Sequence, residues 1–398
     1  MIPFARILSY GNIAPEPDVS KYKKICCNYS STMVLGGSGN LYSFGLPAYG
    51  EVISGRDGKA LMATDVDDCW LGGWGSLYKT KAEKYVYSGF SGTLGISGNI
   101  TFTNLDITSL ITDVIALDKI KKVQVAWRAI YILSTSGDLY AIGMNSNGQL
   151  LAPSTSTTYN KFTLIYRDVV DFVNNDNNCL FVIRGDSKIY AAGNGSYIGV
   201  SQNTSTITLP KPIVLPAGVS DLYTSFDDVF AVCRTGAVLY SPSTNKLYAC
   251  GAGGGAFNKN ASADGSVLTF SEVIMRDDSG FDLEYKGKMF GGSGDPMYPA
   301  ILMQRIDKSS GAAYGYYFSA SNASGAFGVG NNTYQRYFYW SGIEPSAELI
   351  NYNRNALYYS YGNNFLAAGD SSNYTIPGYT TAQYFFVRPT GFRPEDEI

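Results

Sequence analysis

Short runs of apolar residues recur along the chain, separated by glycine, asparagine and serine. In the clearest copy, the turn Ser136-Gly137-Asp138 precedes an apolar run over residues 139–142, which ends at Gly143. Aromatic and β-branched residues bounded by turn residues are typical of short strands. The pattern therefore predicts an all-β chain of short strands joined by tight turns.

The same phrase occurs seven times, at intervals of 44 to 69 residues. In each copy the apolar strand ends at a small residue: Gly45, Gly89, Gly143, Gly193, Gly251, Ala320 or Gly369. Further apolar runs before and after each phrase leave room for four strands per unit. A four-stranded unit repeated at this spacing predicts the blades of a β-propeller.

The remaining strands are assigned by their position relative to the phrase. We expect second strands at 33–35, 130–133, 180–183, 229–232, 301–303 and 357–359. We expect first strands at 123–126, 169–173 and 349–352, and fourth strands at 162–165, 213–215 and 273–275.

Two apolar runs lie outside complete units. Residues 24–27 have the pattern of a first strand, and residues 384–387 have that of a fourth strand. Pairing them in one blade would close the ring and hide both sheet edges. The predicted fold is a seven-bladed β-propeller over residues 23–388, closed by pairing of the N- and C-terminal strands. An N-terminal arm (1–22) precedes it and an acidic tail (389–398) follows it.

Residues 139–150, Leu-Tyr-Ala-Ile-Gly-Met-Asn-Ser-Asn-Gly-Gln-Leu, resemble the repeat of the regulator of chromosome condensation family of seven-bladed propellers. The resemblance covers about residues 23–388 and is most specific in the units ending at Gly45, Gly143 and Gly193. Family repeats carry a histidine on the strand before the phrase. At that place this chain has Ser31, Ala129, Asn178 or Asp228. The resemblance implies the fold. The exchange-factor activity of the family's founding member is not expected for this chain, because the basic flanking segments are missing from this sequence.

Composition excludes several classes of function. The 398 residues include no histidine, and the formal net charge is −3. Without histidine there is no Ser-His-Asp or Cys-His catalysis, and the usual zinc and non-haem iron sites lose their commonest ligand. The charge argues against nucleic acid as a partner. No apolar run approaches the roughly 20 residues that span a bilayer, and the start of the chain lacks the pattern of a signal peptide. We expect no cofactor, no metal and no membrane insertion.

Six cysteines occur without any Cys-x-x-Cys pair: Cys26, Cys27, Cys69, Cys179, Cys233 and Cys250. In a chain of this length we expect buried free thiols rather than a disulfide framework. Such thiols agree with synthesis in a reducing cytosol.

Several polar groups were considered as sites of chemistry. The closest carboxylates are Asp65, Asp67 and Asp68, and Asp227 with Asp228. Paired carboxylates can hydrolyse glycosides, but neighbours on a strand point to opposite faces, so solvated loop acids are the favoured interpretation. The asparagine-rich run 174–178 and the glycine run 251–255 are interpreted as a turn and a loop, rather than calcium and phosphate sites.

Two groups of residues are candidates for binding. Loop tyrosines provide large amphipathic contact surfaces at low entropic cost, and the candidates are Tyr197, Tyr334, Tyr374 and Tyr379. The arm carries an apolar set before a Pro-rich hinge and is suited to docking on another protein: Ile2, Pro3, Phe4, Ile7, Leu8 and Tyr10.

Low charge, abundant glycine, serine, asparagine and tyrosine, and the N-terminal arm are typical of phage virion proteins. We therefore predict a non-catalytic structural or binding protein of a phage particle, associated with the tail or a tail fibre. It would be made in the host cytoplasm and located in the virion. The arm would bind other virion proteins, and the propeller loops would contact a host-surface glycan or protein. Two alternatives remain open: an intracellular propeller adaptor or exchange-factor-like protein, and a carboxylate-based glycan hydrolase.

Overall fold

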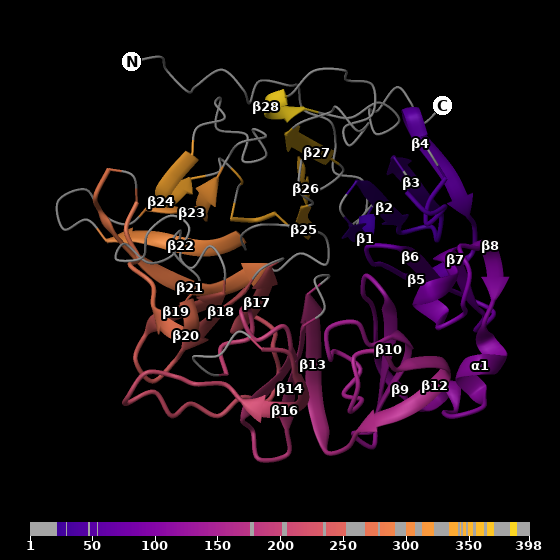
Figure 1. Cartoon of the computed structure of the whole chain (residues 1–398). Coiled ribbons are helices and arrows are strands. Elements are labelled where there is room, and N and C mark those ends of the chain that lie inside the picture. The colour runs from indigo at the N-terminus through magenta and orange to yellow at the C-terminus, as the bar shows by residue number, and fades with distance from the viewer. Residues whose placement is uncertain are drawn as a thin grey trace.

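The computed structural model contains seven four-stranded antiparallel sheets arranged in a ring (Figure 1). This arrangement confirms the predicted all-β, seven-bladed propeller. The structure describes residues 22–28, 30–46, 48–53, 55–175, 179–200, 205–233, 236–251, 267–277, 279–290, 300–306, 313–321, 334–340, 343, 345–347, 349–352, 356–361, 364–369 and 383–387.

Each blade is built from four consecutive strands. Blade 1 contains β1 (Tyr22–Cys27), β2 (Ser31–Gly36), β3 (Leu41–Gly45) and β4 (Gly55–Ala63). Blade 2 contains β5 (Val66–Leu71), β6 (Gly75–Thr80), β7 (Tyr85–Phe90) and β8 (Thr101–Asp106). Blade 3 contains β9 (Ile120–Val125), β10 (Ala129–Ser134), β11 (Leu139–Met144) and β12 (Thr158–Tyr166). Blade 4 contains β13 (Val169–Asn175), β14 (Cys179–Arg184), β15 (Ile189–Gly193) and β16 (Ile207–Pro212).

The remaining blades follow the same order. Blade 5 contains β17 (Phe230–Cys233), β18 (Gly236–Ser241), β19 (Lys246–Gly251) and β20 (Val267–Glu272). Blade 6 contains β21 (Asp282–Phe290), β22 (Ala300–Ile306), β23 (Ala313–Ser321) and β24 (Tyr334–Trp340). Blade 7 contains β25 (Leu349–Tyr352), β26 (Ala356–Tyr361), β27 (Asn364–Gly369) and β28 (Gln383–Val387). In the described residues, helix is limited to α1 (Thr108–Thr112) and the 3-10 turns η1 (Ser91–Leu94) and η2 (Leu117–Lys119).

The first strand of each blade borders the middle of the ring, and the fourth strand lies toward the rim, as β13 and β8 show (Figure 1). Loops between first and second strands therefore share one face of the disc with loops between third and fourth strands. We call this face the 1–2/3–4 face.

The repeated phrase is the third strand in every blade. Its six terminal glycines all have positive φ, from 103° at Gly45 to 136° at Gly89 and Gly369. The pairing of the third strand with the fourth is irregular at this point in all seven blades. Glycine is used here because a side chain would be strained in this conformation, which locally redirects the strand.

Three predicted strand positions were wrong. The run 229–232 was assigned as a second strand, but it overlaps β17, which is the first strand of blade 5. The second strand is β18, which ends just before the turn that leads into β19. The fourth strands β16 and β20 end immediately before the predicted runs 213–215 and 273–275. Apolar residues in those runs contact the core from loops, and Val273 is buried there.

The predicted closure by a shared blade was also wrong. β1 pairs with β2 in blade 1, and β28 pairs with β27 in blade 7. The ring closes through packing between complete blades, with a hydrogen bond of 2.9 Å from Asn351 Nδ2 on β25 to the carbonyl oxygen of Ile25 on β1. β1 begins at Tyr22, one residue before the predicted start of the propeller. Residues 1–21 and 388–398 lie outside the described residues, so the arm and the tail stay predictions.

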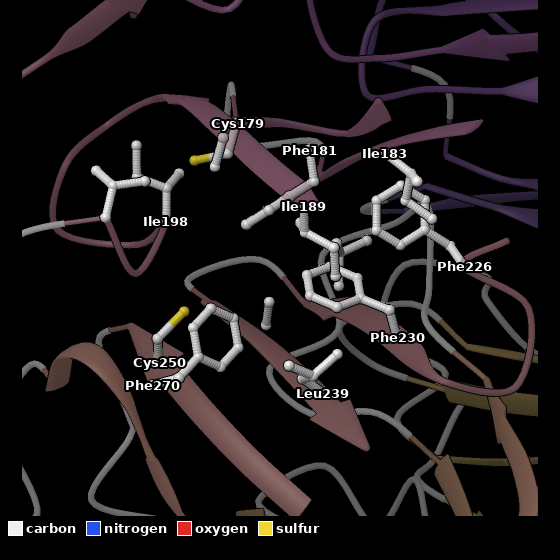
Figure 2. Close-up of a cluster of buried hydrophobic side chains, with 14 of the residues drawn as sticks. Cys179, Phe181, Ile183, Ile189, Ile198, Phe226, Phe230, Leu239, Cys250 and Phe270 are labelled. Atoms are coloured by element: carbon white, nitrogen blue, oxygen red, sulfur yellow. The ribbon is translucent and has the colours of Figure 1, made fainter. Parts of the chain in front are cut away.

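Seven clusters of buried side chains fill the seven spaces between neighbouring blades. Figure 2 shows the one between blades 4 and 5, where Phe181 and Cys179 of β14 face Leu239 of β18 and Phe270 of β20. The cluster between blades 7 and 1 contains Phe44, whose ring centroid lies 5.7 Å from that of Tyr358. Closure of the ring thus uses the same apolar packing as every other interface.

All six cysteines are buried and free, as predicted. Cys26 and Cys69 lie across the interface of blades 1 and 2, with their Sγ atoms 3.8 Å apart. Burial raises the pKa of the Cys179 thiol to about 12. These thiols act as small apolar side chains that fill space between the sheets.

Replacement of Phe44 by alanine tests the closure of the ring. Phe44 is fully buried between blades 1 and 7. We expect the variant to lose about 3–5 kcal/mol of the free energy of unfolding, because a cavity replaces the ring. Urea denaturation followed by tryptophan fluorescence measures the change. Phe181→Ala, at the interface of blades 4 and 5, is the matched control and should cost a similar amount. A much smaller loss at Phe44 would show that closure does not depend on this packing.

The buried thiols predict a loss of stability in alkali. A free thiol ionises near pH 9.0, whereas Cys179 in the folded chain holds its proton to about pH 12. The unfolded chain therefore binds fewer protons between these values, and the free energy of unfolding falls as the pH rises through this range. Each such thiol contributes up to about 1.4 kcal/mol per pH unit. We expect Cys179→Ala to reduce the slope of stability against pH between pH 9 and 11, measured by urea denaturation. An unchanged slope would contradict the assigned role of this thiol.

Candidate functional site

The structure places few of the binding residues predicted from the sequence. Tyr197 is half-buried, and its ring packs against the cluster between blades 4 and 5. Its carbonyl oxygen accepts a hydrogen bond of 3.5 Å from the Cys250 thiol. Tyr334 begins β24, but its side chain lies outside the described part, as do Tyr374, Tyr379 and the whole arm with Ile2, Pro3, Phe4, Ile7, Leu8 and Tyr10.

Two adjoining cavities of about 490 and 450 Å³ occupy the centre of the ring and share Lys122, Gln124 and Asn351 in their walls. The candidate carboxylates Asp67 and Asp68 line the first, and Asp227 and Asp228 line the second. A hydrogen bond from Lys23 lowers the pKa of Asp67, and burial raises the pKa of Asp228.

The charged side chains that line these central cavities, which together we call the channel, form ion pairs mainly between neighbouring blades. Lys24, Asp68, Lys122 and Asp171 occupy one register position on four successive first strands. Lys24 Nζ lies 2.8 Å from Asp68 Oδ1, and Lys122 Nζ lies 2.7 Å from Asp171 Oδ1. Each pair therefore joins a blade to the next one. Among the described residues, no group of three or more cysteine, aspartate or glutamate side chains is placed to hold a metal.

A different group of side chains stands out on the 1–2/3–4 face, over blades 1 to 3. We call it the Trp–Arg cluster; it consists of Tyr49, Trp74, Phe90, Trp127 and Arg128. The ring centroid of Trp74 lies 4.9 Å from Tyr49, 5.0 Å from Phe90 and 4.9 Å from Trp127. The Arg128 guanidinium lies 4.3 Å from the Trp74 ring and 4.9 Å from the Trp127 ring. All five side chains are half-exposed.

Neighbouring loops of the repeats hold this cluster in place. Trp74 lies between β5 and β6, and its carbonyl oxygen accepts a hydrogen bond of 2.8 Å from the Phe90 amide. Arg128 lies between β9 and β10, and its carbonyl oxygen accepts one of 2.9 Å from the Met144 amide. In the loop after β3, the Tyr49 amide donates to a carboxylate oxygen of the fully buried Glu51 over 2.7 Å. The cluster is therefore built on ordered backbone rather than on free loops.

Two glycines permit the close approach of these loops. A Cβ on Gly73 would lie 2.8 Å from Cδ1 of Trp127. A Cβ on Gly143, where φ is 127°, would lie 2.2 Å from the Arg128 carbonyl oxygen. Larger residues at either position would displace the indole or the arginine.

The Arg128 side chain lacks a counter-ion in the described part of the chain. Its Nε atom is buried and has no hydrogen-bond partner there. Burial lowers the pKa of Arg128, although a guanidinium remains charged at neutral pH. The cluster thus offers a cation without a counter-ion among the described residues, placed over two indole rings.

Such an arrangement is suited to binding rather than to catalysis. Tryptophan, tyrosine and arginine are the residue types most enriched among those that dominate the energy of protein–protein interfaces. No nucleophile with an adjacent general base is present in the cluster itself. The described helices also include none that is long and apolar enough to cross a membrane.

Sequence reasoning missed this cluster. It searched for tyrosines in polar loops and for paired acids, whereas Trp74 and Trp127 lie in the short connections between first and second strands. The available signal was that Gly72-Gly73-Trp74 and Ala126-Trp127-Arg128 fall at the same place in consecutive repeats. Equivalent loops of adjacent blades are neighbours in space, so two tryptophans there are brought together.

Comparison with known proteins supports the fold. No protein-family model matches the sequence, and no curated protein matches it. Among solved structures, human WBSCR16 superposes with a TM-score of 0.59 at 13% identity, covering 83% of this chain and 85% of that one. Prp20p from Saccharomyces cerevisiae superposes with a TM-score of 0.50 at 15% identity, covering 93% and 77%. A second structure, of yeast RCC1 (Prp20) bound to Kap60, gives 0.48 at 15% identity over 93% and 74%. At these low identities, the likeness to human WBSCR16 and to Prp20p shows a shared fold and no more.

The more buried and the more exposed Lys–Asp pair are expected to contribute different amounts to the free energy of unfolding. Asp171 is almost buried, and its Oδ2 also accepts a hydrogen bond of 2.9 Å from the Phe226 amide of the loop before β17. Asp171→Ala should lower the free energy of unfolding by about 2–3 kcal/mol, because it leaves Lys122 and that amide without their acceptor. Asp68→Ala is the control: its pair is more exposed and should cost less than about 1 kcal/mol. Urea denaturation compares the two variants. Equal losses in the free energy of unfolding would show that Asp171 does not connect blades 3, 4 and 5.

Proposed function

We propose that this chain is a non-catalytic propeller that binds another protein through the Trp–Arg cluster. The observation that carries the proposal is the stacking of Arg128 over Trp74 and Trp127 on a half-exposed face. A residue set of this kind loses little conformational entropy on binding, because its rings already restrict one another. Arginine and tryptophan at the centre of such a patch are typical of the residues that dominate binding energy.

The structural neighbours agree with a role in protein interaction. Prp20p has been described together with its binding properties to Gsp1p and histones. We carry over only the general use of a propeller as a protein-binding platform. An intracellular adaptor or exchange-factor-like role is one form of the same proposal.

A catalytic role has less support. Asp67 and Asp68, which the hydrolase alternative would use, each form an ion pair with lysine. The hydrogen bond from Lys23 lowers the pKa of Asp67, which makes this carboxylate a poor general acid. Burial and the neighbouring Asp227 raise the pKa of Asp228, whereas Lys288 lowers it. Asp227 and Asp228 are the carboxylates among the residues that line this cavity, and they are adjacent in the sequence rather than placed on facing blades as an acid and a nucleophile.

A virion protein is the narrowest form of the proposal, and it rests on composition alone. In that form, residues 1–20 attach the chain to other virion proteins and the Trp–Arg cluster faces a host-surface protein. Fractionation of the native source with mass spectrometry of its large particles tests this form. The full-length chain, but not one lacking residues 1–20, should be stoichiometric in virus-sized particles. Recovery of the protein only in the small soluble fraction would overturn the virion form and leave the general one standing.

A matched pair of tryptophan variants tests the binding role. Trp127→Ala removes a ring of the cluster, and it should weaken binding of a partner by about 2 kcal/mol or more, or roughly thirtyfold. Trp70→Ala is the control: Trp70 lies in the channel with Lys24 Nζ 4.9 Å from its ring, outside the cluster. Proteins cross-linked to the full-length chain in its native source are quantified by mass spectrometry. We expect a set retained by the wild type and by Trp70→Ala but lost from Trp127→Ala. The same set on all three proteins would contradict the proposed surface.

A further inference from the structure

We propose that Arg128 receives a carboxylate of the partner, from an aspartate or glutamate side chain in a peptide segment. This inference rests on the proposed binding role and deepens it, because it names the chemistry that the Trp–Arg cluster recognises.

Arg128 lacks the partner that a guanidinium in this position needs. No described residue accepts a hydrogen bond from it, and its Nε atom is buried. A buried donor without an acceptor costs free energy, and an acceptor supplied on binding removes this cost. The guanidinium carbon lies over the Trp74 and Trp127 rings, and the terminal N–H groups have no acceptor among the described residues, so they are available to a ligand.

The chain itself shows what completes such an arrangement. Arg184 lies 5.6 Å from the Tyr166 ring and 5.2 Å from the Tyr190 ring, and its Nη2 lies 3.3 Å from Asp168 Oδ2. Aromatic stacking and a carboxylate thus act together at this site.

Arg305 repeats the combination in blade 6. It lies 4.5 Å from the Phe281 ring, and its Nε is 2.8 Å from Asp277 Oδ2. Carboxylates match the fork of donors on a guanidinium and form its strongest hydrogen bonds. Arg128 has the stacking of these two arginines without their aspartate, so the missing element is a carboxylate from outside.

The crowding of the Trp74 ring favours a peptide over a sugar. Sugars bind aromatic side chains through an open ring face. The Arg128 guanidinium lies 4.3 Å from the Trp74 ring. The ring centroids of Tyr49, Phe90 and Trp127 all lie within 5.0 Å of that of Trp74. Little of the Trp74 face is therefore open to a sugar, whereas the donors of Arg128 suit the carboxylate of an acidic peptide segment.

The probe for the test is a random peptide library displayed on phage, selected on the full-length protein. Peptides that bind the wild type but not Trp127→Ala are synthesised in two forms, with their acidic residues intact or replaced by Gln and Asn. Affinities are measured by fluorescence anisotropy on the wild type, Arg128→Gln and Arg184→Gln. Arg184→Gln is the matched control. It also removes a guanidinium beside aromatic rings, but Arg184 already has a carboxylate partner, Asp168, within the chain. Circular dichroism and thermal melting verify that each variant is folded.

We expect the acidic form to bind the wild type and Arg184→Gln at least about tenfold more tightly than the amide form. On Arg128→Gln the two forms should bind equally, since the arginine and the carboxylate act as one pair. Equal binding of both forms to the wild type would overturn the carboxylate inference and leave the Trp127-dependent docking role intact. Failure to recover any Trp127-dependent peptide would overturn the docking role together with it.

Two further measurements distinguish a partner peptide from two other occupants of the site, an acidic glycan and the chain's own acidic tail. An array of uronate- and sialate-containing oligosaccharides tests an acidic glycan. Glycan binding that depends on Arg128, without any peptide binding, would overturn the choice of a peptide. A chain lacking residues 389–398 tests whether its own acidic tail occupies the site. Tighter peptide binding by this shortened chain would show that the tail is the occupant and overturn the assignment to a partner.

Discussion

Every sheet of this protein is apolar on both faces, and each face needs another sheet to cover it. The second strand of blade 3 shows the constraint: Ile130 and Ile132 pack toward blade 2, whereas Tyr131 and Leu133 pack toward blade 4. A row of such sheets would leave one apolar face exposed at each end. Only a ring gives every face a neighbour, and the cluster around Phe44, Tyr358 and Phe365 does this between the last blade and the first. Burial between blades, rather than exchange of a strand, therefore closes the molecule.

The same packing determines what the loops are free to do. Most of the apolar core lies between the sheets, although some connections add buried side chains to it, such as Leu150, Ile198 and Phe226. In six of the seven blades, a glycine near the end of the third strand lets the chain turn sharply onto the 1–2/3–4 face. In blades 1 to 3 this leads to connections held by Glu51, by the backbone of Trp74 and by that of Arg128. A rigid scaffold thus supports the exposed rings, as recognition surfaces require.

Charge is used sparingly, and several of the charged side chains are paired between neighbouring blades. Lys24 with Asp68 and Lys122 with Asp171 connect successive blades across the channel, while Arg184 and Arg305 each have both a ring and an aspartate. Against this background the isolated guanidinium of Arg128 is an exception among the stacked arginines. Arg128 lies on a face of the disc rather than between blades, so we assign its lack of a carboxylate partner to binding and not to stability. The scaffold satisfies its own charges, and the site leaves one for a partner.

The repeated phrase of the sequence determined the fold class, the number of blades and the place of each third strand, and the spacing of the cysteines predicted their free state. These features are local or periodic: a strand that ends in glycine before a turn is specified by its own residues. The sequence did not determine how the ring closes, because residues 24–27 and 384–387 have strand patterns that fit either a shared blade or two separate ones. It also did not reveal the Trp–Arg cluster, whose members are up to 79 residues apart in the chain, from Tyr49 to Arg128. Only the tertiary structure brings them together, since a propeller places equivalent loops of adjacent blades side by side whatever the distance between them along the chain.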